Sequence, residues 1–186
     1  MEVCDCGLPG LLLVKPRVFS DPRGFFLETY HAQRYREHGI TTTFVQFNQS
    51  RSRRQVLRGL HYQLARPQAK LVMVTRGAVF DVAVDIRKGS PTFGRWKGFV
   101  LSDENKHQAF LPEGFAHGFC VLSEEVDFFY QCSEYYAPED ERGVLWNDPD
   151  LAIEWPTGEF VVSPKDAVLP RLRDLRDEDL PVYAAG

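Results

Sequence analysis

Residues 78–86 read Ala-Val-Phe-Asp-Val-Ala-Val-Asp-Ile, so two sets of side chains alternate along this run. Successive side chains of a β-strand point to opposite faces of its sheet, and each set should therefore occupy one face. The first set is Phe80, Val82, Val84 and Ile86, and the second set is Val79, Asp81, Ala83 and Asp85. Two aspartates on one face predict either a polar cavity or a half-exposed strand, and the alternation alone favours neither.

Short runs of β-branched and aromatic residues recur along the whole chain, separated by clusters of Gly, Pro, Asn and Asp. This pattern is typical of an antiparallel sandwich or barrel and not of alternating strands and helices. The predicted strands are Leu11–Phe19, Gly24–Tyr30, Thr43–Asn48, Val56–Leu64, Lys70–Arg76, Ala78–Ile86, Trp96–Leu101, Gln108–Leu111, His117–Leu122 and Val126–Tyr135. So many strands in a short chain predict an all-β fold of two packed sheets, connected by tight turns.

Two segments favour short helices. Helix-forming residues between strands predict a helix over Ala32–His38, which Gly39 is well placed to end. A second, shorter helix is expected near Asp166–Arg173, where Pro170 should interrupt it.

The composition is that of a folded, soluble protein. The chain has 186 residues, 44% of them hydrophobic, which is enough to bury one full core, and we expect a single domain over residues 1–186. A net charge of -4 argues against a nucleic acid or an anionic membrane as partner, because both attract an excess of Lys and Arg. The apolar run Leu11–Val14 is too short for a membrane span or a secretory signal, so we expect a cytoplasmic protein.

Four cysteines, Cys4, Cys6, Cys120 and Cys132, are too few to suggest a disulfide framework. Cys120 and Cys132 are expected to pack as small apolar side chains. The Cys4-x-Cys6 pair by itself is weak evidence for a metal site, and a partly ordered N-terminal arm is the favoured interpretation.

The predicted strand that begins at Val56 carries the most distinctive residues of the chain, Val-Leu-Arg-Gly-Leu-His-Tyr-Gln at positions 56–63. Arginine and histidine are unusual in a run otherwise suited to a core. In a regular strand, Arg58 and His61 would point to opposite faces, because their positions differ by an odd number. Gly59 between them permits a bulge or an unusual backbone angle that would turn one of the two side chains.

Further polar side chains fall in similar strand-like contexts, namely Lys70, His117, Tyr130 and Tyr136. Taken singly, a buried tyrosine is more often a packed residue with a hydrogen-bonded hydroxyl than part of a site. Taken together, a cavity lined by His, Lys and Tyr between aromatic walls is typical of a small-ligand site.

A series of motifs strengthens this interpretation. In chain order they are Arg23-Gly24-Phe25-Phe26-x-Glu28, Gln46-x-Asn48-x-Ser50, Val56–Gln63, Phe80–Arg87, Ser90–Gly94, Pro112–Phe119, Trp146-Asn147-Asp148-Pro149 and Ser163-x-Lys165-Asp166. From Leu11 to Asp166 the sequence resembles the dTDP-4-dehydrorhamnose 3,5-epimerase family of dTDP-L-rhamnose synthesis. The resemblance implies a cupin-like jelly roll, a double-stranded β-helix, without cofactor or metal. It also implies a homodimer that exchanges an N-terminal segment bearing Arg23 and Glu28.

The substrate of that family is dTDP-4-keto-6-deoxy-glucose, whose C4 ketone acidifies the hydrogens on C3 and C5. Epimerisation to dTDP-4-dehydro-L-rhamnose needs a base, a group that stabilises the enolate and an acid on the opposite face. By resemblance, His61 is the base and Asp166 holds its ring. Lys70 stabilises the enolate, and Tyr130 is the acid, with Tyr136 as the second candidate.

The same resemblance assigns substrate binding, with the two arginines on the diphosphate, to Arg23, Glu28, Gln46, Asn48, Arg58, Lys70, His117, Tyr136, Glu141 and Lys165. Three positions depart from the family pattern. Phe47 stands where aspartate is common, Gln49 where histidine is common, and Ala69 where glycine usually precedes the lysine. Phe47 and Gln49 flank the predicted substrate-binding amides, so they bear on the preference for base or sugar and not on the proposed catalytic residues.

Three alternatives remain open. A relative that epimerises only C3 or only C5 can keep the same catalytic residues. A metal-dependent cupin would need clustered histidines, and the chain has no close His-x-His pair. A sugar-nucleotide-binding protein without catalysis would be expected to lack part of the catalytic set, which here is complete: His61, Lys70, Tyr130 and Asp166.

Overall fold

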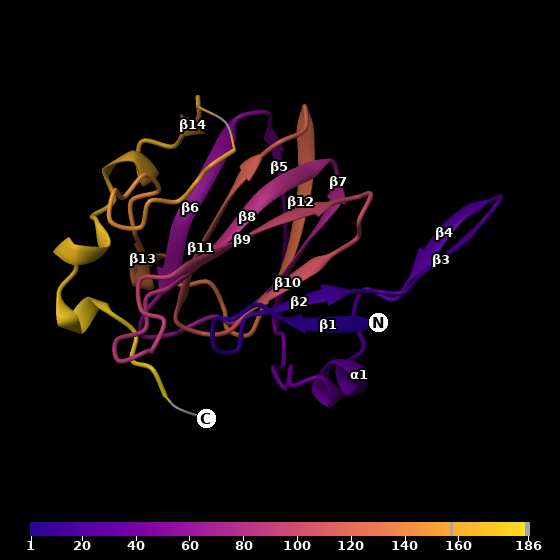
Figure 1. The fold of residues 1–186 in the computed structure, drawn as a ribbon, viewed down its shortest axis with the longest axis horizontal. Helices are drawn as coiled ribbons and strands as arrows, with labels where there is room; N and C mark the ends of the chain where they lie inside the picture. The colour runs from indigo at the N-terminus through magenta and orange to yellow at the C-terminus, as the bar shows by residue number, and fades with distance from the viewer. Residues whose placement is uncertain (157, 185–186) are drawn as a thin grey trace.

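The computed structural model describes residues 1–156 and 158–184 and consists of two β-sheets and a separate hairpin (Figure 1). In spatial order, the first sheet contains β1 (Glu2–Asp5), β2 (Leu12–Lys15), β10 (Gln108–Leu111), β7 (Lys70–Arg76), β12 (Glu125–Cys132) and β5 (Gln46–Arg53). The second contains β13 (Glu141–Gly143), β6 (Val56–Gln63), β11 (Phe115–Val121), β8 (Ala78–Asp85) and β9 (Trp96–Ser102), with β14 (Val161–Val162) parallel to β6. The other strand pairs of these two sheets are antiparallel, which confirms the predicted fold class.

Each predicted strand has a counterpart, and β7 and β10 have the predicted bounds. The single predicted strand Leu11–Phe19 is wrong, because the chain divides at Pro16 into β2 and β3 (Val18–Asp21). Proline has no N–H to donate to a ladder and so ends the pairing of β2. β5 starts later than predicted and continues to Arg53. The short strands β13 and β14 were not predicted, because two or three residues carry no period.

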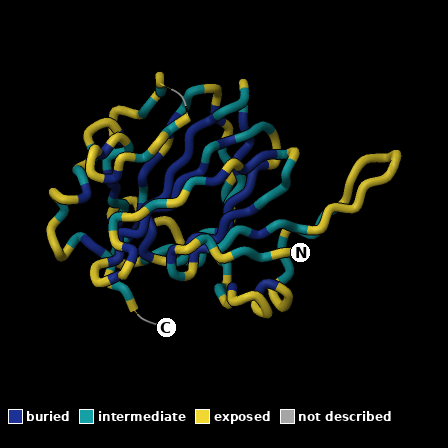
Figure 2. Tube along the Cα trace, in the orientation of Figure 1, coloured by how far each residue is buried: buried dark blue, intermediate teal, exposed yellow. Residues whose placement is uncertain are grey.

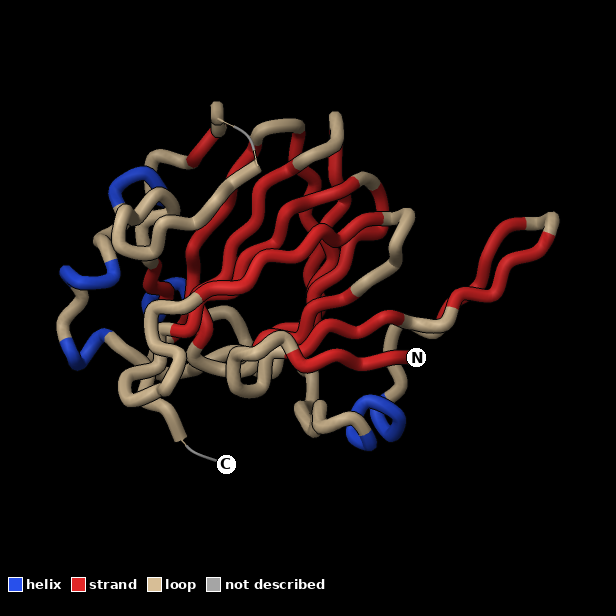
Figure 3. Tube along the Cα trace, in the orientation of Figure 1, coloured by secondary structure: helices blue, strands red, loops and turns tan. Residues whose placement is uncertain are grey.

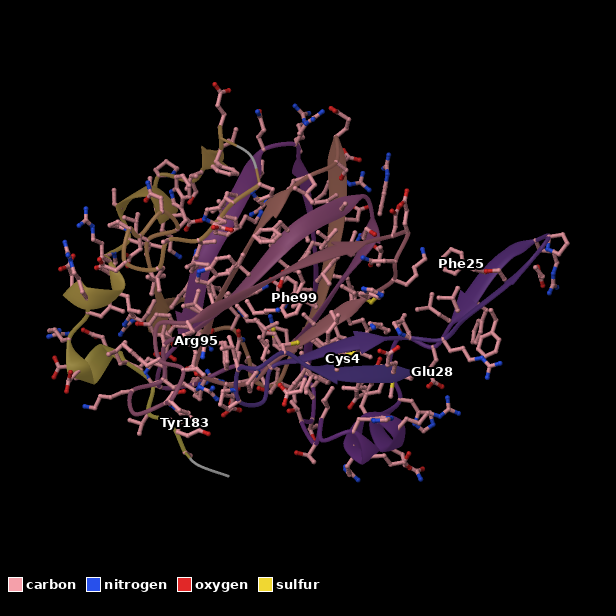
Figure 4. The ribbon with its side chains drawn as sticks, in the orientation of Figure 1. Cys4, Phe25, Glu28, Arg95, Phe99 and Tyr183 are labelled. Carbon is pink, nitrogen blue, oxygen red and sulfur yellow. The ribbon has the colours of Figure 1, made fainter. Side chains whose placement is uncertain are left out.

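The N-terminus is part of the first sheet. β1 pairs with β2 from Glu2 opposite Lys15 to Asp5 opposite Leu12, so the expectation of a partly ordered arm here is wrong. Figure 4 shows Cys4 within this strand. The backbone hydrogen bonds to β2 hold the segment in place, which its sequence alone did not indicate.

The predicted helix Ala32–His38 is confirmed as α1 (Ala32–Glu37), one residue shorter. His31 caps its start by accepting a hydrogen bond from the N–H of Arg34. Gly39 follows it with a φ of 87°, a left-handed conformation that glycine adopts at little cost.

The short helix predicted near Asp166–Arg173 is confirmed only as helical turns, and the predicted interruption at Pro170 is confirmed. The segment forms two 3-10 turns, η2 (Asp166–Val168) and η3 (Leu172–Asp174), on either side of Pro170. Two further turns are η1 (Pro138–Asp140) and η4 (Asp177–Asp179). All of these helical segments lie at the margins of the sheets (Figure 3).

The main hydrophobic core lies between the two sheets. It contains apolar side chains of β7, β10 and β12 from the first sheet and of β8, β9 and β11 from the second, including Val72, Val74, Leu111, Phe128, Val79, Ala83, Leu101, Phe119 and Val121. The outer face of the second sheet is covered by C-terminal residues such as Leu151 and Leu172. That of the first sheet is covered by Tyr35 and Ile40. Figure 2 shows the resulting buried strands at the centre of the body.

β8 is buried on both faces, which decides between the two interpretations of its aspartates. Val82 and Val84 pack in the cluster beneath the C-terminal segment, and Asp81 and Asp85 are both 0% exposed. The half-exposed strand is therefore the wrong alternative. A buried carboxylate needs hydrogen-bonding or charged partners, and the two aspartates find different ones.

β3 and β4 (Gly24–Leu27) form an arm, residues 18–27, that projects away from the body (Figures 1 and 2). Its phenylalanines are unusually accessible: Phe19 is 49%, Phe25 57% and Phe26 69% exposed. An isolated two-stranded hairpin is marginally stable in water, and contiguous exposed aromatic side chains mark an interaction surface.

Asp85 is the centre of a buried polar network at the end of β8. It accepts two hydrogen bonds from the Arg87 guanidinium, at 2.9 and 2.8 Å, and one from each hydroxyl of Ser90 and Thr92, both at 2.6 Å. Burial raises the pKa of Asp85, but these bonds outweigh burial and leave it below the ordinary value.

We expect Asp85→Asn to lower the free energy of unfolding by about 3 kcal/mol, because Arg87 keeps its buried charge and loses its partner. Since the folded pKa is lowered, the stabilisation is present above the ordinary value of 3.8 and is lost as pH falls through the folded pKa. Urea unfolding of both proteins from neutral pH down to about pH 3 measures this. The difference in free energy of unfolding between wild type and Asp85→Asn should become smaller in acid. A difference that stays constant with pH would contradict the stabilising role of the Asp85 carboxylate.

Candidate active site

A cavity of about 770 Å³ lies between the two sheets. β5, β7 and β12 form its first wall, β6 and β11 form its second wall, and residues 161–166 border it. It brings together most of the predicted site residues, namely Gln46, Asn48, Arg58, His61, Lys70, His117, Tyr130, Tyr136, Glu141, Lys165 and Asp166. A few polar groups converging between aromatic walls are the usual form of a small-molecule site.

His61, on β6, is held by a carboxylate from far along the chain. Its Nε2 lies 2.7 Å from Oδ1 of Asp166, and the other Asp166 oxygen accepts a hydrogen bond from the N–H of Gly59 at 3.3 Å. Burial raises the pKa of Asp166, but the bonds from His61 and Gly59 outweigh it and hold the pKa below its ordinary value. The ionised carboxylate fixes the ring and leaves the other ring nitrogen available for proton transfer.

Glu141, on β13, is a second carboxylate beside His61. Its Oε1 accepts a hydrogen bond from Lys165 Nζ at 2.7 Å and lies 3.8 Å from His61 Nε2, while its Oε2 accepts a short hydrogen bond from the Tyr136 hydroxyl. Burial raises the pKa of Glu141, but Lys165 and Tyr136 outweigh it and lower it. The bond to Glu141 raises the pKa of Tyr136 to about 12, so this tyrosine serves as a hydrogen-bond donor.

Lys70 and Tyr130 lie on the wall opposite His61. They come from the neighbouring strands β7 and β12 of the first sheet, whereas His61 belongs to the second sheet. Burial lowers the pKa of Lys70 against the opposing charges of Glu141 and Asp81. Burial also raises the pKa of Tyr130, so its phenol is protonated at neutral pH.

Arg58 and His61 both line the cavity, as the predicted irregularity at Gly59 requires. The register of β6 against β11 shifts at this point, and Gly59 has a φ of 117°. A Cβ at Gly59 would lie 2.6 Å from the Cα of Gly118 and 2.7 Å from the carbonyl oxygen of His117, so only glycine fits. Arg58 donates a hydrogen bond from Nε to Ser52 at 3.0 Å.

β5 presents alternate residues to the cavity. Gln46, Asn48 and Ser50 line it, and the contribution of Ser50 was not predicted as a site residue. Phe47 and Gln49 are exposed on the other face, and the ring of Phe47 packs near Phe129 with centroids 6.4 Å apart. In this chain the two departures from the family pattern therefore point away from the cavity, and any effect on substrate preference would be indirect.

Two predicted site residues lie outside this cavity. Arg23, at the tip of the arm, forms an ion pair with Asp21 at 2.6 Å and has an 89% exposed side chain. Glu28 pairs with Arg34 at 2.8 Å at the base of the arm. Figure 4 shows Glu28 and Phe25 on the arm side of the molecule. Tyr136, expected in a strand-like context, lies in a loop, because β12 ends at Cys132.

Sequence reasoning missed a second His–Asp pair. Nε2 of His117, on β11, lies 2.8 Å from Oδ2 of Asp81, on β8. The alternation of β8 placed two aspartates on one face, but it did not show which of them bonds a residue of the cavity. Cys132, expected only to pack, also lines the cavity.

The described residues also bear on metal and membrane binding. Within residues 1–156 and 158–184, no three His, Cys, Asp or Glu side chains are arranged to hold a metal ion. In the same residues, no helix is long and apolar enough to cross a membrane. All four cysteines are free thiols, and Cys120 and Cys132 are buried as expected.

Residues 5–174 match the family model described as dTDP-4-dehydrorhamnose 3,5-epimerase. The chain belongs to this family. A dTDP-4-dehydrorhamnose 3,5-epimerase from Neisseria gonorrhoeae is 52% identical over 167 residues, which are 89% of this chain and 51% of that relative. The chain thus spans about half the length of that relative. A dTDP-4-dehydrorhamnose 3-epimerase from Streptomyces niveus is 44% identical over 187 residues, 99% of this chain and 90% of the relative.

Among solved structures, the dTDP-6-deoxy-D-glucose-3,5-epimerase of Legionella pneumophila, in complex with dTDP-4-keto-L-rhamnose, superimposes with a TM-score of 0.96. It is 52% identical, and the match covers 99% of both chains. The resemblance, the cupin-like jelly roll and the isomerase class predicted from the sequence are thereby confirmed.

We expect Gly59→Ala to abolish most activity and to lower the free energy of unfolding by roughly 3 kcal/mol or more, because alanine brings both backbone strain and a clash. The matched control is Gly39→Ala, which has a positive φ of 87° but no atom within 4 Å of its Cβ. Gly39→Ala should lower the free energy of unfolding by about 1 kcal/mol and leave activity unchanged. Equal losses in thermal unfolding would show that close packing at Gly59 is unimportant.

Proposed function

We propose that this chain epimerises dTDP-4-dehydro-6-deoxy-D-glucose at C3 and C5 to give dTDP-4-dehydro-L-rhamnose. The observation that carries the proposal is the division of groups between the two walls of the cavity. His61 with Asp166 lies on one side, and Lys70 with Tyr130 lies on the other. Inverting a carbon requires removal of a proton from one face and return of a proton to the opposite face, so base and acid must face each other.

His61 is proposed as the base. It takes the proton from C3 or C5, and the electron pair of the broken C–H bond moves onto the C4 oxygen to form an enolate. Asp166 stabilises the imidazolium that forms, since its lowered pKa keeps it ionised. Glu141 adds a second negative charge, because its Oε1 lies 3.8 Å from His61 Nε2, the nitrogen that Asp166 also contacts.

Lys70 and Tyr130 are proposed to complete the inversion. The Lys70 ammonium stabilises the negative C4 oxygen. The attraction between the two charges is stronger in a site sheltered from water than in bulk water. Tyr130 then donates its hydroxyl proton to the carbon from the opposite face. We favour Tyr130 over Tyr136 as the acid because the Tyr136 hydroxyl already donates a hydrogen bond to Glu141.

Arg58 is proposed to hold the diphosphate from the same strand as the base. Its planar guanidinium suits phosphate oxygens, and the bond to Ser52 fixes its stem. Gln46, Asn48, His117, Glu141, Lys165 and Tyr136 are proposed as the remaining contacts of this chain with the nucleotide and the sugar. Each proposed step uses protein side chains, so the proposed reaction needs no cofactor.

Arg23 and Glu28 are proposed to act in a homodimer that exchanges the arm. Both lie outside the cavity of their own chain, and the arm exposes three phenylalanines that a partner subunit would cover. β5 is the last strand of its sheet and lines the cavity, so a partner's arm beside it would reach the substrate. The cytoplasm, where cysteines stay reduced, is the proposed compartment, in keeping with four free thiols.

Epimerisation at C3 alone is the second candidate. The Streptomyces niveus relative is a 3-epimerase that matches nearly the whole chain, so shared ancestry alone does not separate the two activities. The proposed base and acid would serve either outcome, and only the position of the ring between the walls distinguishes them.

The test is NMR of dTDP-4-keto-6-deoxy-glucose with the protein in heavy water. We expect deuterium at both C3 and C5, whereas uptake at C3 alone would favour the second candidate. His61→Ala should abolish uptake at both carbons. Tyr130→Phe should retain some exchange and reduce completed epimerisation by about 10²- to 10⁴-fold. Full exchange by the His61 variant would overturn the assignment of the base.

Mixing two inactive variants tests the exchanged arm. Arg23→Ala and His61→Ala chains, unfolded and refolded together, should regain about a quarter of wild-type activity, because half the dimers then hold one intact site. Each variant refolded alone should stay inactive. If Arg23 acts within its own chain, the mixture will show no recovery.

The phenylalanines of the arm can be tested separately by sedimentation. Phe26→Ser should shift the protein from dimer to monomer, because Phe26 is the most exposed of the three phenylalanines. Phe93→Ser changes a side chain outside the arm that is 41% exposed and should leave the dimer intact. Equal effects of the two substitutions would contradict the role of the arm.

A further inference from the structure

His117 lines the cavity and belongs to a second His–Asp pair, beside the pair of His61 and Asp166. β6 and β11 are antiparallel neighbours, and His117 is the direct cross-strand partner of His61. The two imidazoles therefore come from adjacent positions of one wall. His117 donates to or accepts from Asp81 through Nε2 at 2.8 Å, and its ring stacks on Phe128 with centroids 6.1 Å apart. The ring is fixed at one edge and on one face.

Asp81 is costly for the fold in its present form. The residue is 0% exposed, and its Oδ1 has no hydrogen-bond partner among the described residues. Buried carboxylates that serve the fold are usually fully bonded, and Asp85, four residues along the same strand, shows this with bonds to Arg87, Ser90 and Thr92. The hydrogen bond of Asp81 goes to His117, which lines the cavity, and this indicates that Asp81 serves the site and not only the fold.

The bond to Asp81 decides which hydrogen-bonding group His117 offers to a ligand. An ionised carboxylate can only accept, so the hydrogen of a neutral imidazole must be on Nε2. Nδ1 is then left with a free lone pair, and no described residue donates a hydrogen bond to it. A free acceptor in a sugar-binding cavity matches a hydroxyl group.

We propose that Asp81 is a positioning residue that holds His117 in the Nε2–H tautomer, so that Nδ1 accepts a hydrogen bond from a hydroxyl of the bound hexose. This inference rests on the proposed function, because it needs a sugar in the cavity. It predicts that Asp81 contributes to binding of the hexose and not of the nucleotide.

The test compares two ligands by calorimetry, dTDP and dTDP-glucose, where the second carries hexose hydroxyls but no ketone to react. Asp81→Asn should bind dTDP as wild type does and dTDP-glucose about tenfold more weakly, the loss of one hydrogen bond. Asp85→Asn is the matched control, a buried aspartate of the same strand that serves the fold. It should be less stable but bind both ligands as wild type does.

Nitrogen NMR of the imidazole reads the tautomer directly. In wild type the His117 signal, identified by its absence from His117→Gln, should be that of Nε2–H. In Asp81→Asn the Nδ1–H form should gain population, because an amide can donate to Nε2 as well as accept from it. Adding Asp81→Asn to His117→Gln should not weaken dTDP-glucose binding further, whereas a merely structural aspartate would add its own loss.

The inference is overturned if Asp81→Asn binds dTDP-glucose as tightly as wild type, or if it weakens both ligands equally. A wild-type protein that takes up no deuterium into the 4-keto sugar would refute the proposed epimerisation instead. That result would leave the tautomer and the binding data to be judged independently.

Discussion

The carboxylate of Asp166 is the interaction on which the cavity depends. One oxygen binds His61 and the other binds the N–H of Gly59, so a single side chain fixes both the imidazole and the irregular backbone beside it. That irregularity turns Arg58 into the same cavity as His61, which a regular strand would forbid. The short 3-10 turn that carries Asp166 therefore organises a strand more than a hundred residues earlier in the chain.

Burial acts on the pKa values of Asp166, Glu141, Tyr130 and Lys70, but its outcome differs with the partners of each group. Asp166 and Glu141 have lowered pKa values because hydrogen bonds outweigh burial, whereas the pKa of Tyr130 is raised and that of Lys70 lowered by burial. Carboxylates thus stay charged on the histidine side and a phenol stays protonated on the other side. This separation of charge is the arrangement that proton transfer across a sugar ring needs.

The two aspartates of β8 show how one strand serves both the fold and the site. Asp85 is bonded on both oxygens to Arg87, Ser90 and Thr92, while Asp81 bonds His117 through one oxygen and has no partner for the other among residues 1–156 and 158–184. In the arm, likewise, the backbone and the side chains have different roles. Its backbone forms a hairpin within the chain, Arg23 pairs with Asp21 of the same hairpin, and its three phenylalanines stay exposed, as the proposed exchange of the arm requires.

The sequence by itself determined most of the strands, because period-two alternation and turn residues are local signals. Most of the predicted residues that line the cavity came from the resemblance to the epimerase family and not from the alternation. The sequence also indicated the irregular backbone at Gly59. Arg58 and His61 would point to opposite faces of a regular strand, and a glycine between them permits a bulge that turns one of the two side chains. Strand bounds failed where pairing, not composition, decided them, as at β1 and β5.

Only the tertiary structure decided which groups meet. Asp166 binds His61 across a separation of 105 residues, Asp81 and not Asp85 bonds a histidine of the cavity, and Arg23 lies outside the cavity. Alternation fixes the face of a strand on which a side chain lies, but not which strand or loop packs across from that face. That choice depends on the order of strands in the two sheets, which is set by the packing of the whole chain.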